Sequence, residues 1–315
     1  MAEAELLCIG NYSDTDRAAL DRDFAPRWVS GVDGIAALPD AAREAIRAIA
    51  FKGHGTMGAT QMDALPNLGL IANYGVGYDS IDVPAASERG VKVTNTPDVL
   101  NDDVADLAVA MLLAQSRRIV QGSDWVRSGT WAKQGEMALN RKVSGGRVGI
   151  VGLGRIGREI ADRLAAFKMQ IHYHSRSEKD VPGGWTYHSD PVSLANAVDY
   201  LIVSLVGGPE TMGYVSAEVI AALGPDGVIV NISRGTTIDE AAMLDALENG
   251  RLRGAALDVF LNEPDIDSRF MALDNVLLQP HQGSGTVETR AAMGQLQRDN
   301  IANFLAGRDL VTPVN

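Results

Sequence analysis

A cluster of glycines lies between an apolar run and an amphipathic one and limits the folds that the chain can adopt. Residues 148–157 read VGIVGLGRIG, and the amphipathic run continues to residue 166. Because the apolar run is short and the apolar residues after it recur at helical spacing, we expect a buried strand, a tight turn and a helix.

The glycines of this turn have separate expected roles. Gly152 permits the tight turn, Gly154 lets the backbone approach a pyrophosphate, and Gly157 lets helix and strand pack closely. The helix would begin at Arg155 and Ile156, so that its first N–H groups face the phosphates. These residues therefore predict a dinucleotide site, and the alternative is a plain strand-to-helix turn.

The end of the next strand indicates which dinucleotide is bound. A strand about 20 residues after the glycines usually ends in Asp or Glu, which binds the ribose hydroxyls of NAD. Here the run 170–174 is followed by Ser175, Arg176 and Ser177, and Ser175 lies 23 positions after Gly152. A carboxylate would repel a 2′-phosphate, whereas arginine and hydroxyl donors bind one. We expect NADPH or NADP, with NADH the weaker alternative; otherwise Arg176 is an ordinary surface charge.

Short apolar runs alternate with amphipathic segments along the chain, which is typical of α/β proteins with parallel sheets. The expected strands are 6–9, 48–51, 70–73, 91–94, 148–151, 170–174, 200–204, 228–231, 255–259 and 276–278. The expected helices include 39–49, 104–116, 155–166, 217–223, 240–248 and 288–305.

The length of 315 residues favours two domains. A turn-rich stretch at 95–103 is the expected boundary, and the last helical run would cross back to the first domain. We expect a discontinuous substrate-binding domain, 1–101 plus 288–315, and an NADP-binding domain, 102–287, with no appended regulatory domain.

Charge and apolar content argue against several classes of partner. The net charge of −12, from 28 Lys and Arg against 40 Asp and Glu, disfavours nucleic acid and anionic lipid. The N-terminus is acidic where a signal peptide is basic, and the apolar run 107–114 is too short to cross a bilayer. The single cysteine, Cys8, excludes an internal disulfide. We expect a cytoplasmic location.

Three chemically capable residues each follow an apolar strand: Arg234 in GVIVNISRG, Glu263 in GAALDVFLNEP and His281 in NVLLQPHQGS. Ligands of open parallel sheets bind outside the carboxyl ends of the strands, so these residues are expected at one cleft. Taken singly, each has an ordinary explanation: a turn cap, a solvated acid and a loop histidine with internal partners. The other histidines, His54, His172, His174 and His188, are interpreted as structural.

Together with a nicotinamide site, the three residues predict reduction of a 2-oxo acid. Hydride addition to a ketone builds negative charge on its oxygen, and histidine is suited to donate the proton near neutral pH. A carboxylate such as Glu263 favours the imidazolium and orients the ring. Arg234 can bind the adjacent carboxylate through two parallel hydrogen bonds and polarise the ketone.

An ordered series of motifs resembles the D-isomer-specific 2-hydroxyacid dehydrogenases over nearly the whole chain. The motifs are NYGVGYDSIDVPAASERGVKVTNTPDVLNDDVADLAVAMLLA, GRVGIVGLGRIGREIA, VIVNISRGTTIDE, GAALDVFLNEP and LLQPHQGSGTVETR. Within that family the chain is most similar to the NADPH-dependent glyoxylate/hydroxypyruvate reductases. The resemblance implies two flavodoxin- or Rossmann-like doubly wound domains with an interdomain cleft, and a homodimer.

The resemblance also implies roles for individual residues. Arg234 would bind the substrate carboxylate with the backbone N–H groups of Val76 and Gly77, Glu263 would partner the histidine, and His281 would be the general acid and contact the substrate. Further nucleotide contacts are implied at Thr211, Ile232, Ser233, Asp258 and Gly283.

The segment 124–144 occupies the interdomain and dimer region of the resembled family, and Trp125, Trp131 or Met137 is a candidate to reach a partner's active site. One departure is the pair Gly207 and Gly208, where many relatives have a proline-containing turn. Two other functions stay open: reduction of bulkier 2-oxo acids such as phenylpyruvate or 2-oxogluconate, and a nucleotide-sensing corepressor or scaffold.

Overall fold

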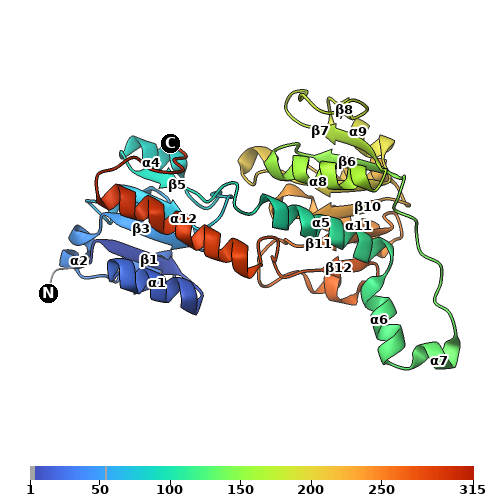
Figure 1. The fold of residues 1–315 in the computed structure, drawn as a ribbon, viewed down its shortest axis with the longest axis horizontal. Helices are drawn as coiled ribbons and strands as arrows, with labels where there is room; N and C mark the ends of the chain where they lie inside the picture. Colours follow the sequence, from blue (N-terminus) through green and yellow to red (C-terminus); the bar gives the residue numbers. More distant parts are fainter. Residues whose placement is uncertain (1–3, 54) are drawn as a thin grey trace. The chain divides into compact units, whose positions relative to one another are not determined.

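A computed structural model describes residues 4–53 and 55–315. The chain divides into two compact units, one ending at Leu100 and completed by Thr286–Asn315, the other formed by Asn101–Gly285 (Figure 1). His54 lies outside the described residues. In the described ranges, no helix is both long and apolar enough to span a membrane.

The first unit contains a parallel sheet in the order β2-β1-β3-β4-β5, which is the flavodoxin-like order. Its strands are β1 (Leu6–Gly10), β2 (Arg27–Val29), β3 (Ala48–Lys52), β4 (Leu70–Asn73) and β5 (Lys92–Thr94). Its helices are α1 (Asp14–Phe24), α2 (Asp40–Ala45), α3 (Ala59–Asp63), α4 (Val83–Glu88) and α12 (Val287–Leu305).

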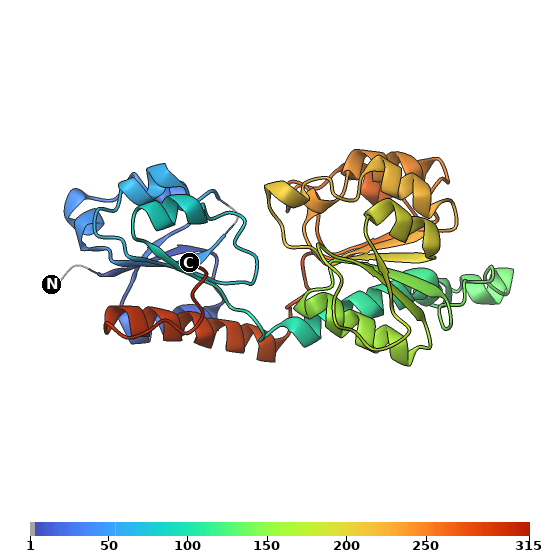
Figure 2. The same cartoon turned by 90° about the horizontal axis from the view of Figure 1, so that it is seen from above.

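Alternate residues of the central strands bury against different helices. Leu6 and Cys8 of β1 pack with Leu20 of α1 and Ile301 of α12. The neighbouring Leu7 and Ile9 belong to the core that includes residues of α3 and α4. Figure 2 shows the two layers of helices on either side of this sheet. Both faces are covered, which explains the continuous apolar runs of its strands.

The second unit contains a parallel sheet in the order β12-β11-β10-β9-β6-β7-β8. Its strands are β6 (Arg147–Val151), β7 (Gln170–His174), β8 (Thr186–His188), β9 (Tyr200–Val203), β10 (Val228–Asn231), β11 (Gly254–Leu257) and β12 (Val276–Leu278). The chain starts in the middle at β6, moves outward to β8, and returns to the other side of β6 with β9. This is the doubly wound Rossmann order, with the switch point between β6 and β9.

Helices cover both faces of the second sheet (Figure 2). They are α5 (Asn101–Ser116), α6 (Ile119–Arg127), α7 (Thr130–Gln134), α8 (Arg155–Ala166), α9 (Pro191–Ala197), α10 (Ala217–Leu223) and α11 (Glu240–Glu248). The helix α5 packs on α8, and α9, α10 and α11 share a core with the strands. The helices α6 and α7 contain no buried residue and project from the unit (Figure 1). The predicted α/β class with two parallel doubly wound sheets is confirmed.

Candidate active site

The carboxyl ends of all seven strands in the second sheet lie at one level. Leu278, Leu257 and Asn231 are in register on β12, β11 and β10. The register continues across the sheet through Val203, Val151, His174 and His188. The candidate residues therefore rise from a common edge, on loops of different lengths.

The glycine turn has the geometry that a dinucleotide needs. Gly152 has φ +96°, and a Cβ on it would lie 2.5 Å from the Ser204 carbonyl oxygen. A Cβ on Gly157 would lie 2.1 Å from the Gly152 carbonyl oxygen. A Cβ on Gly154 would meet no heavy atom within 4 Å. Protein packing thus requires the first and third glycines, whereas the second faces open space through which a ligand can approach.

The start of α8 supports the same interpretation. Gly154 is its N-cap residue and provides no side-chain acceptor for the first N–H groups of the helix, which begins at Arg155. Such groups form a favourable site for an anion. The residues present therefore fit the pyrophosphate of a dinucleotide.

The end of β7 forms a closed turn. Ser175 Oγ donates a hydrogen bond to the Ser177 carbonyl at 2.6 Å, and the Lys179 N–H donates to Tyr173 Oη at 3.0 Å. Arg176 is exposed, and in residues 4–53 and 55–315 no carboxylate forms an ion pair with it. Because the Ser175 hydroxyl already donates within the turn, a phosphate here would rely mainly on Arg176 and Ser177.

Glu263 and His281 meet above β11 and β12. His281 Nδ1 lies 2.7 Å from Glu263 Oε2, and Glu263 Oε1 accepts the Phe260 N–H at 2.8 Å. The His281 side chain is 37 % exposed and that of Glu263 19 %. The carboxylate is thus fixed from two sides, and an Nδ1–H donated to it leaves Nε2 as the ring atom that can exchange a proton with a ligand.

Asp258 shapes the loop that carries the histidine. It is 1 % exposed, and its carboxylate accepts the N–H groups of Gln282 at 2.6 Å and Gly283 at 2.8 Å. The Asp258 carbonyl accepts the His281 N–H, which helps to hold that residue at φ +54°. Burial raises the pKa of Asp258, and the two backbone donors oppose the shift. The predicted nucleotide contact of Asp258 and Gly283 stays a prediction, because both carboxylate oxygens already have protein donors.

Arg234 follows β10 on a loop pressed against the Glu263 loop. A Cβ on Gly235 would lie 1.9 Å from the Phe260 carbonyl carbon, so only glycine allows this approach. The Arg234 carbonyl accepts Thr237 Oγ1 at 2.6 Å, and its Nη1 donates to the Ser233 carbonyl at 2.9 Å. The side chain is half-buried. The loop backbone is therefore fixed, with one guanidinium nitrogen already bonded.

Ile232, Ser233 and Thr211 lie at the same edge of the sheet. Ile232 and Ser233 are buried, and Ser233 Oγ donates to the Leu205 carbonyl. Thr211 Oγ1 donates to the Val206 carbonyl at 2.7 Å. These hydroxyl groups hold the loop that follows β9, so any nucleotide contact there would involve backbone groups or a second hydrogen bond on the oxygen.

Val76 and Gly77 belong to the first unit, on the loop after β4. Asn73 Nδ2 donates to the Gly77 carbonyl at 2.9 Å, and Asn95 Nδ2 donates to the Val76 carbonyl at 2.9 Å. In the part of the chain that the structure describes, the N–H groups of Val76 and Gly77 donate to no protein atom. The loop thus presents two backbone donors, which suits a carboxylate.

The two asparagines were not predicted from the sequence. Asn73 ends a buried strand and also donates to the Gly75 carbonyl at 3.1 Å. A polar residue directly after an apolar run was the available signal, since side-chain amides commonly hold turn backbones.

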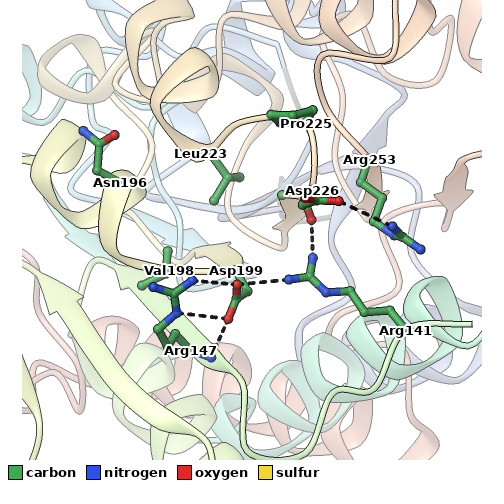
Figure 3. Close-up of a pocket in the computed structure, with 10 residues that line it drawn as sticks. Arg141, Arg147, Asn196, Val198, Asp199, Leu223, Pro225, Asp226 and Arg253 are labelled. Atoms are coloured by element: carbon green, nitrogen blue, oxygen red, sulfur yellow. Dashed lines mark hydrogen bonds and ion pairs between the residues drawn. The ribbon is translucent and has the colours of Figure 1, made fainter.

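A polar pocket of about 520 Å³ lies at the opposite edge of the second sheet, where β6, β9 and β10 begin (Figure 3). Asp199 lies between Arg141 and Arg147, whose guanidinium nitrogens are 3.0 and 2.9 Å from its Oδ1. Hydrogen bonds from Arg147 lower the pKa of Asp199. The Arg141 guanidinium also covers the Tyr200 ring, 4.8 Å from its centroid. Arg141 comes from the segment between α7 and β6, and the pocket lies at the edge where ligands of such sheets do not bind.

Comparison with known proteins agrees with this arrangement. A family model described as D-isomer specific 2-hydroxyacid dehydrogenase, NAD binding domain, matches residues 109–283. The chain belongs to the D-isomer specific 2-hydroxyacid dehydrogenase family. The matched segment lies within the second unit and contains the glycine turn, Arg234, Glu263 and His281.

Full-length relatives of this dehydrogenase family cover most of the chain. It is 47 % identical to hydroxyphenylpyruvate reductase of Plectranthus scutellarioides over 271 residues, 86 % of each chain. It is 45 % identical to glyoxylate/hydroxypyruvate reductase A of Arabidopsis thaliana over 288 residues, 91 % of this chain and 90 % of that one. The crystal structure of NADPH-dependent glyoxylate/hydroxypyruvate reductase from Sinorhizobium meliloti with NADP and malonate matches with a TM-score of 0.93 and 42 % identity, covering 99 % and 97 % of the two chains.

Proposed function

We propose that this dehydrogenase reduces glyoxylate and hydroxypyruvate to D-2-hydroxy acids with NADPH. The observation that carries the proposal is the 2.7 Å contact between His281 and Glu263 at the carboxyl edge of a dinucleotide-binding sheet. A bound NADPH would supply a hydride to the ketone carbon. His281 supplies the proton from Nε2 to the ketone oxygen, so that one hydride and one proton complete the alcohol.

The carboxylate of Glu263 holds the His281 ring before and after the transfer. Its bond to the Phe260 N–H prevents it from turning away as the proton leaves His281. Arg234 binds the substrate carboxylate and polarises the ketone, and the N–H groups of Val76 and Gly77 are proposed to bind the same carboxylate. In this assignment the first unit is the substrate-binding domain and the second is the NADP-binding domain.

NADPH is the proposed cofactor because of the end of β7. Arg176 is exposed without a carboxylate partner in the described ranges, and Ser175 and Ser177 flank it. The Sinorhizobium relative, 42 % identical, is NADPH-dependent and was crystallised with NADP. NADH is retained as the weaker alternative.

We also propose a cytoplasmic homodimer that pairs through the α6–α7 segment. Its large apolar side chains are accessible: Ile119 is 56 % exposed, Val126 57 % and Trp131 58 %. Exposed apolar groups concentrated on a projecting segment are typical of protein interfaces. Trp125 Nε1 donates to the Gly135 carbonyl within the segment, so Trp131 is the better candidate to reach a partner's active site.

A second candidate substrate class is the bulkier 2-oxo acids, because the hydroxyphenylpyruvate reductase of Plectranthus is 47 % identical. The test is oxidation of NADPH and of NADH with glyoxylate, hydroxypyruvate, phenylpyruvate and 2-oxogluconate, with the chirality of the product determined. Highest kcat/KM for glyoxylate or hydroxypyruvate with NADPH supports the proposal. Tight NADPH binding without turnover of any acid would favour the scaffold alternative.

A further inference from the structure

His174, the last residue of β7, bonds to two other elements through its side chain. It is 5 % exposed. Its Nδ1 lies 2.8 Å from the His188 carbonyl oxygen of β8, and its Nε2 lies 2.6 Å from Tyr214 Oη. The rings of His174 and Tyr214 stack with centroids 5.7 Å apart and planes inclined by 22°. Both ring nitrogens are therefore occupied.

The partners of the ring identify its tautomer. A carbonyl oxygen only accepts, so His174 Nδ1 carries the hydrogen, and in the neutral ring Nε2 is then the acceptor. The donor to Nε2 is therefore the Tyr214 hydroxyl. Burying a polar group costs free energy unless it forms a hydrogen bond. The His174–Tyr214 pair therefore has one favoured orientation, whereas two apolar side chains could pack in several.

His174 also lies between two parts of the candidate cofactor site, the glycine turn and the loop after β9. The Gly152 N–H donates to the His174 carbonyl at 2.9 Å, and Ser175 follows directly in the chain. Tyr214 ends the loop that contains Thr211, and its N–H donates to the Thr211 carbonyl at 3.2 Å. One residue thus connects these parts: its backbone bonds to the glycine turn, and its side chain bonds to the end of the loop after β9.

We propose that His174 is a positioning residue of the cofactor site: through Tyr214 it fixes the loop of residues 204–214 relative to the Ser175–Ser177 turn, and so sets the fit of the adenosine end of the dinucleotide. The proposal rests on the proposed function, because it assumes that a dinucleotide lies over the glycine turn. His174 would then have a role in cofactor binding in addition to its structural contacts.

Three variants separate the contacts of this ring. Tyr214→Phe keeps the stacked ring and removes the hydroxyl. His174→Asn keeps a donor near the Nδ1 position but loses the acceptor for Tyr214. His174→Gln places an amide oxygen near the Nε2 position and keeps that acceptor. The dissociation constants of NADPH and NADH are measured by calorimetry on the ligand-free protein, together with KM, kcat and Tm.

We expect Tyr214→Phe and His174→Asn each to raise both dissociation constants about 5- to 10-fold, the loss of one neutral hydrogen bond. The double variant should lose no more cofactor affinity than either single variant, because both substitutions remove the same hydrogen bond. His174→Gln should bind both cofactors nearly as the wild type does. The KM for the cofactor should rise while kcat stays unchanged.

A matched control, Arg176→Ala, separates this proposal from the cofactor assignment. It should raise the dissociation constant of NADPH and leave that of NADH unchanged. An unchanged ratio of the two dissociation constants would count against the cofactor assignment but would not affect the His174 result. Wild-type affinity for both cofactors in folded Tyr214→Phe would overturn the positioning role. Additive losses of cofactor affinity in the double variant would also overturn the positioning role. Tyr214→Phe removes a single oxygen atom, so the test remains decisive if a His174 variant fails to fold.

Discussion

Glu263 holds His281 with one carboxylate oxygen and the Phe260 N–H with the other, at 2.7 and 2.8 Å. This arrangement orients the ring without using its second nitrogen. We expect His281→Ala to lower kcat by about 10²- to 10⁴-fold, the usual contribution of a general acid. Glu263→Gln should have a smaller effect, since the amide keeps an acceptor but loses the charge. Steady-state kinetics with glyoxylate tests both, and NADPH binding measured by calorimetry should be unaffected.

Arg234→Lys should raise the KM for the 2-oxo acid about 10- to 100-fold, because one ammonium group cannot reproduce two parallel hydrogen bonds to a carboxylate. The loop backbone is held through Thr237 and Asn231, so the substitution should not change the fold. Titration with glyoxylate at saturating NADPH measures the effect. An unchanged KM would remove Arg234 as the carboxylate binder.

The double substitution Ser175→Asp with Arg176→Ala should shift the cofactor preference toward NADH. The new carboxylate can accept ribose hydroxyls and repels a 2′-phosphate. The NADPH/NADH ratio of kcat/KM should fall by at least about tenfold, which is about 1.4 kcal/mol. If this ratio stays as in the wild type, the end of β7 does not select the cofactor.

Alanine at two glycines of the turn should separate binding from folding. Gly154→Ala adds a Cβ that meets no protein atom, so Tm should be unchanged while the dissociation constant of NADPH rises. Gly157→Ala places a Cβ 2.1 Å from the Gly152 carbonyl oxygen and should destabilise the protein by about 1–3 kcal/mol. Thermal melts with and without NADPH distinguish the two. An equal decrease of Tm in both variants would contradict the assignment of the open space beside Gly154 to the ligand.

The pair His172 and His188 should make stability depend on pH. Their ring nitrogens are 3.1 Å apart, and His188 Nδ1 lies 2.9 Å from Ser193 Oγ. Burial lowers the pKa of both, the charge of His188 lowers that of His172 further, and Asp190 partly opposes the shift at His188.

The unfolded chain therefore binds these protons more readily than the folded one. The two histidines contribute fully to the free energy of unfolding when the pH is above their pKa in the unfolded chain, which is about 6.5. This contribution is lost as the pH falls below that pKa. His172→Gln should reduce the difference in Tm between pH 7.5 and pH 5.5, measured by calorimetry. A difference as large as in the wild type would show that other groups cause the acid sensitivity.

The central strands could be predicted because both faces of each sheet are covered, which makes the strands continuously apolar. The strands β4, β7, β10 and β12 have the predicted bounds. The edge strands β2 and β8 were missed, since RWV and TYH are short and partly exposed. The helix α1 was missed too, because DTDRAALDRDF is mostly polar and has few apolar residues to show a period.

The candidate site could be predicted in its residue types but not in its contacts. Three polar residues after three apolar runs indicated Arg234, Glu263 and His281. Their spacing did not show that Glu263 reaches His281, since that depends on the path of the loop after β11. The asparagines behind Val76 and Gly77 were missed, because a structural amide in a turn looks like any other loop residue in a single sequence.

The level edge of the second sheet has a consequence for how such an enzyme can diversify. Arg234 and His281 each stand three positions beyond strand residues that are in register, and Arg176 stands two beyond His174. The loops after β10, β11 and β12 contact one another, so a change in the length of one of them would also shift its neighbours. Arg176 lies on the separate turn after β7, where a one-residue change would move it and leave Arg234, Glu263 and His281 in place. Substrate range and cofactor preference can therefore evolve separately on an unchanged sheet.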